Sequence, residues 1–196
     1  MIVTLLRHTD KPEELVLQAM AKCYDSKPTL KSLQAAIKAG HTSLLEHVTF
    51  TWEIWGISRV VLAQLTRHRI ASYTVRSQRY CDESTANTYC PSDAELSEEQ
   101  FELYRDYVMC AQEGYRRLLD AGAKKEIARY VLPQAIETEL ILTMNARELH
   151  DVFFPLRISK RAQPEIRELA ELMLQDCCDK APGIFGSLSD WKGCMQ

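Results

Sequence analysis

Length, composition and charge limit what this chain can be. Its 196 residues carry 24 Lys and Arg against 27 Asp and Glu, a formal net charge of -3, and 46% of the residues are hydrophobic. These values are ordinary for a globular protein with one core. Seven glycines and seven prolines are too few for a collagen-like or linker-rich chain. The net negative charge gives no bulk electrostatic reason to bind nucleic acid.

Targeting segments and metal-binding patterns are not apparent in the sequence. No apolar run reaches the roughly 18–20 residues that span a bilayer, and residues 1–20 lack the basic and long apolar regions of a secretory signal. We therefore expect a cytoplasmic protein with no membrane partner. The seven cysteines form no C-x-x-C pair, so we expect reduced thiols and no metal site. Cys177 and Cys178 are interpreted as packing residues.

The first half of the chain alternates between strand and helix patterns. We predict a strand over Ile2–Leu6, helices over Glu13–Cys23 and Leu30–Ala39, a helical turn over Thr42–His47, a strand over Val48–Ile54 and a helix over Ser58–Arg67. Apolar residues every four positions mark the first helix, and Gly40 closes the second. The second strand alternates and is rich in β-branched and aromatic residues. Ser43 and Glu46 have the spacing of a capping box.

The second half is mainly helical. We predict helices over Ser97–Leu119 and Lys124–Val131, a strand over Thr138–Met144, and helices over Asn145–Phe154 and Pro164–Lys180. Ser97 and Gln100 form a second capping-box pattern at the start of the longest helix. Several helices with few scattered strands indicate a mixed α/β (α+β) fold. We expect a single domain over residues 1–196, with a small central sheet flanked by helices.

One segment departs strongly from the average composition. Between Ile54 and Cys81 there is no Asp, Glu or Lys, but there are five arginines: Arg59, Arg67, Arg69, Arg76 and Arg79. The planar guanidinium fork matches a phosphate or carboxylate bidentately. The segment therefore indicates a site for a small anionic ligand. The alternative is a set of surface ion pairs with the six acidic residues between positions 93 and 106.

Common catalytic and nucleotide-binding motifs are missing. The sequence contains no G-x-x-x-x-G-K-[ST] loop and no G-x-G-x-x-G fingerprint, so neither a P-loop nor a Rossmann site is supported. It also contains no H-E-x-x-H and no G-x-S-x-G, which removes the sequence support for a zinc protease or a serine hydrolase.

The arginine segment carries a family signature. Arg67-His68-Arg69, seven residues and then Ser77 resemble the R-H-R-x7-S motif of the flavin-dependent thymidylate synthases. Further blocks are similar to that family in matching order, from about residue 3 to about residue 185: Gly40-His41-x-Ser43-x-x-Glu46-His47-x-x-Phe50, Ser58-Arg59 with Gln64, Ser77-Gln78-Arg79-Tyr80, Ala128-Arg129-x-x-Leu132-Pro133, Asn145-Ala146-Arg147-Glu148-Leu149, Leu156-Arg157 and Arg161-Ala162-Gln163-x-Glu165-Ile166-Arg167.

The resemblance implies a fold, an assembly and a reaction. The fold is mixed α/β, and the assembly is a homotetramer with active sites between subunits. The reaction methylates dUMP at C5 to give dTMP, with FAD as cofactor and NADPH and methylenetetrahydrofolate as co-substrates. Most of the chemistry then belongs to the cofactors, and the protein supplies binding, orientation and electrostatics.

The resemblance also implies roles for individual residues. Flavin contacts correspond to His41, Ser43, Glu46, Arg67, His68, Arg69, Asn145, Arg147 and Asp151, with His150 as the alternative to Asp151. Nucleotide contacts correspond to Gln64, Arg67, Val75, Arg76, Ser77, Gln78, Arg79, Arg129 and Arg157. Arg157 matches the residue that polarises the uracil ring near N3, where a guanidinium stabilises the negative charge that develops as C5 becomes nucleophilic. Structural alternatives are helix caps for Ser43, Glu46 and Asn145 and a surface ion pair for Arg157.

Three positions depart from the family pattern. Thr74-Val75 replaces the usual Asn-Glu, the spacing from Asn145 to Arg157 is one residue longer, and Pro164 stands where an aromatic residue is typical. Loss of the carboxylate at Val75 favours, as an alternative substrate, UMP or another uridine nucleotide, for example in nucleoside-antibiotic biosynthesis. A third reading is a flavin or nucleotide binder without catalysis.

Overall fold

The protein is described by a computed structural model that covers residues 1–25, 27–91 and 95–194. Its residues group into two compact units. Unit 1 comprises Met1–Ile54, Gln64–Thr74 and Ile141–Gln196, and unit 2 comprises Trp55–Ala63 and Val75–Leu140. The mixture of helices with a small four-stranded sheet confirms the predicted fold class. Asp93, one residue of the acidic stretch, lies outside the described residues.

The sheet has the strand order β1-β2-β4-β3. Its strands are β1 (Ile2–His8), β2 (Thr49–Ser58), β3 (Ala71–Val75) and β4 (Glu137–Asn145). Backbone hydrogen bonds join the end of one strand to the start of its neighbour: Thr9 to Thr49, Ala146 to Val48 and Arg76 to Glu139. Neighbouring strands therefore run antiparallel.

The three predicted strands are present, and each is longer than predicted. β2 continues to Ser58 through Gly56, whose φ of 72° lies in the left-handed region open to glycine. β3 was not predicted. Apolar Ala71, Tyr73 and Val75 alternate with exposed Ser72 and Thr74, as in a half-buried strand, but the run has only five residues.

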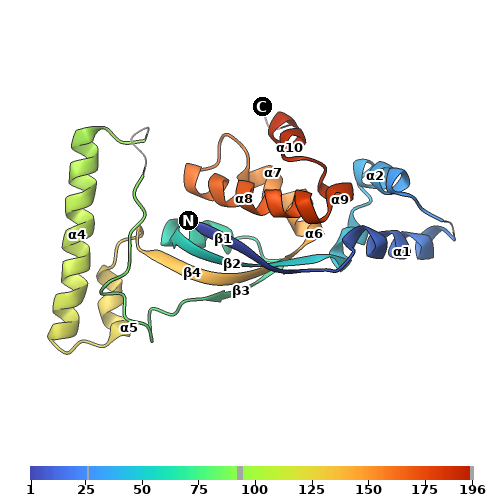
Figure 1. The fold of residues 1–196 in the computed structure, drawn as a ribbon. Helices are drawn as coiled ribbons and strands as arrows, with labels where there is room; N and C mark the ends of the chain where they lie inside the picture. The colour runs from blue at the N-terminus through green and yellow to red at the C-terminus, as the bar shows by residue number, and fades with distance from the viewer. Residues whose placement is uncertain (26, 92–94, 195–196) are drawn as a thin grey trace. The chain divides into compact units, whose positions relative to one another are not determined.

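Aromatic side chains form the core of unit 1 beneath α8 (Pro164–Lys180), which packs on β1 (Figure 1). Phe50 and Trp52 point to the same face of β2, with ring centroids 5.6 Å apart, and both are fully buried. Phe185 meets Phe50 edge to face at 5.9 Å from the short helix α9 (Pro182–Phe185). The indole Nε1 of Trp52 donates a hydrogen bond to Oδ2 of Asp176 on α8 at 2.9 Å. This bond joins the sheet to the helix.

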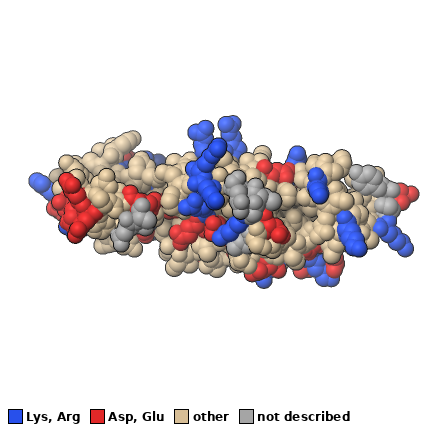
Figure 2. Space-filling view, turned by 90° about the horizontal axis from the view of Figure 1, so that it is seen from above, with Lys and Arg blue, Asp and Glu red and all other residues tan. Residues whose placement is uncertain are grey.

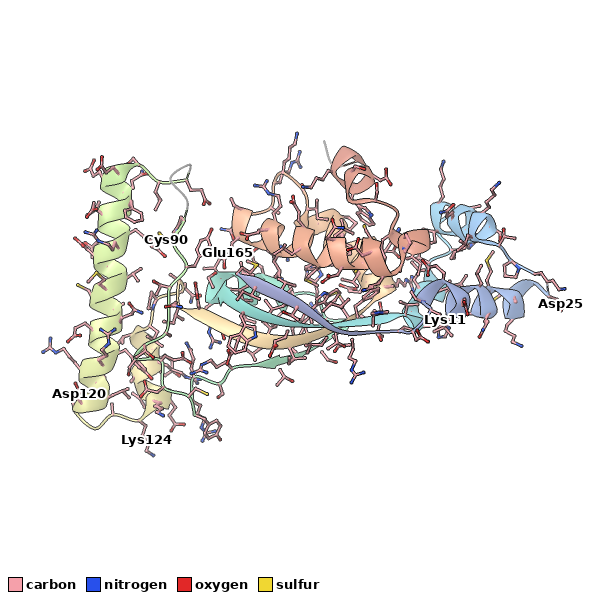
Figure 3. The ribbon with its side chains drawn as sticks, viewed as in Figure 1. Lys11, Asp25, Cys90, Asp120, Lys124 and Glu165 are labelled. Carbon is pink, nitrogen blue, oxygen red and sulfur yellow. The ribbon has the colours of Figure 1, made fainter. Side chains whose placement is uncertain are left out.

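The N-terminal helices follow the prediction closely. α1 (Pro12–Tyr24) lies between Lys11 and Asp25, both labelled in Figure 3 and both in the left-handed conformation. α2 (Leu30–Lys38) packs against α1 and α9 and is followed by Gly40, whose φ is 84°. The positive φ explains why glycine ends this helix.

Unit 2 is built around the long helix α4 (Glu98–Asp120). Ser97 accepts a hydrogen bond from the Gln100 backbone, and the Gln100 side chain accepts one from the Ser97 backbone, so the predicted capping box is present. A turn between Asp120 and Lys124, both labelled in Figure 3, leads into α5 (Lys125–Ala128) and the 3₁₀ turn η2 (Arg129–Val131). α4 packs against both.

Several helix boundaries differ from the prediction. The helix predicted over Ser58–Arg67 is the shorter α3 (Arg59–Leu65). The short helices α9 and α10 (Leu188–Cys194) were not predicted. Ser43 lies inside the 3₁₀ helix η1 (Ser43–His47), after the N-cap Thr42, and no side chain caps this helix. The Ser43–Glu46 capping box, the structural alternative for these two residues, is therefore wrong, because Ser43 is not at the cap position.

The helix predicted over Asn145–Phe154 contains a π-helical turn. The helical residues run from α6 (Ala146–Glu148) through η3 (Leu149–Phe153) to α7 (Phe154–Arg157). Pro155 lies in the first turn of α7. Its ring nitrogen has no hydrogen for the α-helical bond to Asp151, and its ring would crowd that carbonyl. The wider π turn avoids this clash.

The surface mixes charges of both signs. Basic and acidic side chains are interspersed on the face shown in Figure 2. Within the described residues, no helix has the length and apolar character needed to cross a membrane. The cysteines whose side chains are described are all free, and burial raises the pKa of Cys178 to about 11 and that of Cys177 well above its usual range. The burial of Cys177 and Cys178 agrees with a packing role.

The bond between Trp52 and Asp176 gives a test of the core. Trp52→Phe removes the donor and leaves the half-buried carboxylate without it, so we expect the free energy of unfolding to fall by about 1–3 kcal/mol in a urea titration. Asp176→Asn keeps an acceptor oxygen and serves as the matched control, with a smaller loss. An unchanged free energy of unfolding in Trp52→Phe would show that the hydrogen bond contributes nothing.

Candidate functional site

The candidate residues are divided between the two units. All the proposed flavin contacts belong to unit 1, together with Gln64 and Arg157. Val75, Arg76, Ser77, Gln78, Arg79 and Arg129 belong to unit 2. Contacts within each unit show which of these side chains are grouped.

A chain of hydrogen bonds, buried at His68 and Glu148 and partly exposed at Arg157 and Gln64, connects four residues of unit 1. Nδ1 of His68 lies 3.1 Å from Oε1 of Glu148, and both side chains are almost fully buried, with 2% and 10% of their surface exposed. Nε of Arg157 donates to Nε2 of His68 at 3.0 Å. Nη2 of Arg157 donates to the backbone oxygen of Gln64 at 3.0 Å, and Nη1 donates to its side-chain oxygen at 3.4 Å.

Tyr73 fixes the loop that carries His68. This loop joins α3 to β3, and the Tyr73 hydroxyl is 2.7 Å from the Leu65 carbonyl oxygen and 2.8 Å from that of His68. The phenol donates to both carbonyls through one shared proton. Burial, followed by the negative charge of Glu148, raises the pKa of Tyr73 to about 12, so the phenol keeps its proton at neutral pH.

The charge states in this chain follow from burial. Burial lowers the pKa of His68 below its usual range, the Arg157 charge lowers it further, and the bond to Glu148 opposes both effects. His68 is therefore neutral at pH 7. Burial, together with the positive charge of Arg67, also lowers the pKa of Arg157. The guanidinium stays charged, because arginine does not lose its proton in proteins.

A second group surrounds the exposed side chain of Arg147 in α6. Its guanidinium forms ion pairs with Glu46 of η1 and with Asp151, the latter at 3.6 Å. Thr42 donates a hydrogen bond to the same Asp151 oxygen. The Asn145 side chain caps α6 by accepting from the Glu148 backbone at 2.8 Å, which leaves its amide nitrogen as a donor. The structural role suggested for Asn145 is thus present.

Asp151 and His150 have different neighbours. Asp151 joins the ion pairs of Arg147 and Glu46. His150 donates toward Asp151 at 2.7 Å, and its ring meets Trp191 edge to face at 5.2 Å and lies near Phe185. The flavin-contact assignment between these two residues stays a prediction, but only Asp151 lies directly among the other residues assigned to flavin.

Arg67 and Arg69 have the donors that an anionic ligand needs. Both side chains are exposed, and neither forms a hydrogen bond or an ion pair with another described residue. His41 and Ser43 are likewise exposed, without such a side-chain bond in the described part of the chain. With the Asn145 amide and the Arg147 guanidinium, this donor set fits the phosphates and ring carbonyls of a flavin nucleotide.

The arginines of unit 2 are mostly paired. Arg76 contacts the buried Glu83 and the half-buried Glu139, each at 3.2 Å, and Arg79 contacts Glu126 at 2.8 Å. These carboxylates lie outside the acidic stretch at positions 93–106. Arg76 and Arg79 therefore form ion pairs, as the alternative interpretation of the arginine segment expected, but their partners are not the acidic residues that it named.

Two further donors in unit 2 suit a ligand with acceptor atoms. The amide nitrogen of Gln78 and Nε of Arg59 are buried without a hydrogen-bond partner among the described residues. Burial lowers the pKa of Arg59, Glu83 raises it, and the positive charge of Arg129 lowers it again. Two like charges and unpaired donors are the electrostatics of an anion site. Ser77 accepts a hydrogen bond from the Arg79 backbone.

Sequence reasoning missed three residues of these groups. Thr42, Tyr73 and Glu148 were assigned no role, yet each bonds a candidate residue. Glu148 gave the only usable signal, since it lies three residues after the cap Asn145 on the buried side of a helix. A buried carboxylate requires a partner. Among the described residues there is no cluster of three or more His, Cys, Asp and Glu that could hold a metal ion.

Fold and site together describe a mixed α/β protein with a buried Arg–His–Glu chain beside unpaired arginines. Residues 4–183 match the model of the family described as thymidylate synthase complementing protein. The chain belongs to this family.

Three relatives, each named flavin-dependent thymidylate synthase, support the assignment. The protein of Geobacter sulfurreducens is 41% identical over 94% of this chain and 85% of its own length. That of Pyrococcus furiosus is 39% identical over 89% and 78%, and that of Clostridium tetani is 35% identical over 93% and 84%. The similarity therefore extends over most of both chains.

The neutral state of His68 predicts a pH dependence of stability. Unfolded His68 binds a proton near pH 6.5, whereas native His68 resists protonation, so lowering the pH from 7 to 5 favours unfolding. The slope from this residue is at most about 1.4 kcal/mol per pH unit. We expect His68→Gln to flatten the pH profile of the unfolding free energy in urea titrations.

Phe153→Leu is the matched control for this test. Phe153 packs edge to face on the His68 ring at 5.0 Å, and its replacement lowers stability at every pH while the imidazole and its slope remain. A wild-type slope that persists in His68→Gln contradicts the assignment.

Proposed function

We propose that this protein methylates dUMP at C5 to give dTMP, using FAD, NADPH and methylenetetrahydrofolate. The observation that carries the proposal is the junction of Arg157 with His68 of the R-H-R triplet through a 3.0 Å hydrogen bond. Family membership and the names of the relatives support the same reaction. A flavin, when bound, supplies the redox chemistry that converts the transferred carbon into a methyl group.

Flavin binding is assigned to the donors of unit 1. Arg67 and Arg69 offer two unpaired guanidiniums to the cofactor phosphates, and Asn145 offers its amide nitrogen. Arg147 is held between Glu46 and Asp151, which limits its side-chain motion and presents a fixed edge. His41 and Ser43 complete the set of donors. His68, also assigned to flavin, has no free N–H, since its ring nitrogens are bonded to Glu148 and Arg157, so it supports the site through those contacts.

Nucleotide binding is assigned to Gln64, Arg67, Val75, Arg76, Ser77, Gln78, Arg79, Arg129 and Arg157. The Arg79 side chain is 59% exposed and forms an ion pair with Glu126. To bind the nucleotide phosphate, Arg79 exchanges this carboxylate for the phosphate. Arg129 and the unpaired nitrogen of Gln78 need no such exchange. Their arrangement between subunits of a homotetramer belongs to the proposal.

Arg157 has the central part in the chemical step. Its charge, placed against the O2/N3 edge of uracil, stabilises the negative charge that grows as C5 attacks the incoming carbon. Three of its five N–H donors are used by His68 and Gln64, which leaves two for the pyrimidine. The protein itself supplies no covalent nucleophile in this scheme.

Replacement of Arg157 tests the proposal. Arg157→Ala should lower the release of tritium from 5-tritiated dUMP by about 100-fold or more, the scale for losing a group that stabilises developing charge. Flavin absorbance should remain with the protein. Arg117→Ala, on the exposed surface of α4, is the control with unchanged turnover. Retained turnover in Arg157→Ala would remove Arg157 from the mechanism.

A second candidate substrate is UMP or another uridine nucleotide. Val75 would explain acceptance of a ribonucleotide, because its half-buried side chain at the end of β3 offers no carboxylate to the nucleotide sugar. A site without a group that reads the 2′ position discriminates weakly. We expect UMP and dUMP to differ by about 10-fold or less in kcat/KM under this alternative. A preference for dUMP of about several hundred-fold, measured with both substrates under the same conditions, rejects it.

A further inference from the structure

The buried chain through His68 has a defined direction. Arginine has only N–H donors, so the contact from Arg157 Nε requires His68 Nε2 to accept with its lone pair. A neutral imidazole then carries its hydrogen on Nδ1 and donates it to Oε1 of Glu148. One tautomer satisfies both contacts, and the other places two N–H groups face to face.

The backbone is adapted to bring Glu148 and Arg157 to one histidine. They are nine residues apart, which in an uninterrupted α-helix is about two and a half turns and places them on opposite sides. The π turn over Leu149–Phe153 takes up one residue more than an α turn. The effective spacing becomes about 2.2 turns, and both side chains can reach His68.

We propose that Glu148 is a positioning residue for the methylation reaction. By accepting the Nδ1 hydrogen it selects the His68 tautomer whose Nε2 lone pair holds the Arg157 guanidinium, which keeps the two remaining Arg157 donors directed at the substrate. Glu148 does not touch the substrate in this scheme. The inference rests on the proposed function for the role of Arg157, whereas the tautomer itself depends only on the three contacting residues.

Other carboxylates and cations around the chain are accounted for. Tyr73 lies close enough to feel the charges of both Glu148 and Arg157, and Arg67 adds positive charge on the Arg157 side. Phe153 covers the His68 ring edge to face. Glu148 is the one carboxylate within hydrogen-bond distance of His68 among the described residues.

The tautomer is measured directly by the ¹⁵N chemical shifts of the imidazole in protein labelled at its five histidines, with the His68 signals assigned by their loss in His68→Gln. The wild type should show Nδ1 protonated and Nε2 unprotonated. Glu148→Leu should show a mixture or the opposite tautomer. Glu148→Gln, whose amide can accept or donate, should show partial mixing and keeps the test open if the Leu variant does not fold.

Kinetics decide whether the tautomer matters for the reaction. We expect kcat for tritium release to fall about 10- to 100-fold in Glu148→Leu, the range for removing a partner that orients a functional side chain. It should fall less in Glu148→Gln. The change in KM should be smaller than the change in kcat, because Arg157 keeps its charge and still attracts the nucleotide.

Glu165→Gln is the matched control, because Glu165 is also a buried carboxylate of unit 1. It should leave the ¹⁵N pattern of His68 unchanged. An unchanged His68 pattern in both Glu148 variants overturns the inference, and so does a changed pattern with wild-type kcat. If the wild type itself releases no tritium from dUMP or UMP, the proposed function fails, while the ¹⁵N shifts still report on the tautomer.

Discussion

The hydrogen bond between Arg157 and His68 is the contact on which the candidate site depends. It joins the end of a helical segment to the loop after α3, and it requires a neutral histidine with a free lone pair. Burial lowers the pKa of His68, and Glu148 takes its remaining hydrogen. The position of the Arg157 guanidinium therefore depends on the neutral state of His68 and on which of its nitrogens carries the hydrogen.

The same contact explains irregular features nearby. Pro155 and the π turn alter the helix between Glu148 and Arg157, so that both reach the same imidazole ring. Tyr73 holds the carbonyls of Leu65 and His68, which gives an otherwise polar, arginine-rich loop a fixed course. The π turn and the fixed loop after α3 thus occur where the site needs a defined geometry.

The arginines of the acid-free segment differ in their partners. In unit 1, Arg67 and Arg69 are exposed without acidic partners in the described part of the chain, as suits binding of an anion. In unit 2, Arg76 and Arg79 are paired with Glu83, Glu139 and Glu126. Composition alone treats these side chains alike, because the acids that neutralise Arg76 and Arg79 lie outside the acid-free segment.

The sequence by itself determined the fold class, most long elements and the family signature. Periodicity identifies α4 and α8 because each has an apolar stripe over many turns, and Ser97 and Gln100 mark a cap through contacts three residues apart. Tertiary structure decided β3, the π turn, the loss of the Ser43 cap and the roles of Glu148 and Tyr73. The role of Glu148 depends on His68, a partner 80 residues away, and local patterns carry no information about which distant side chain will share a buried contact.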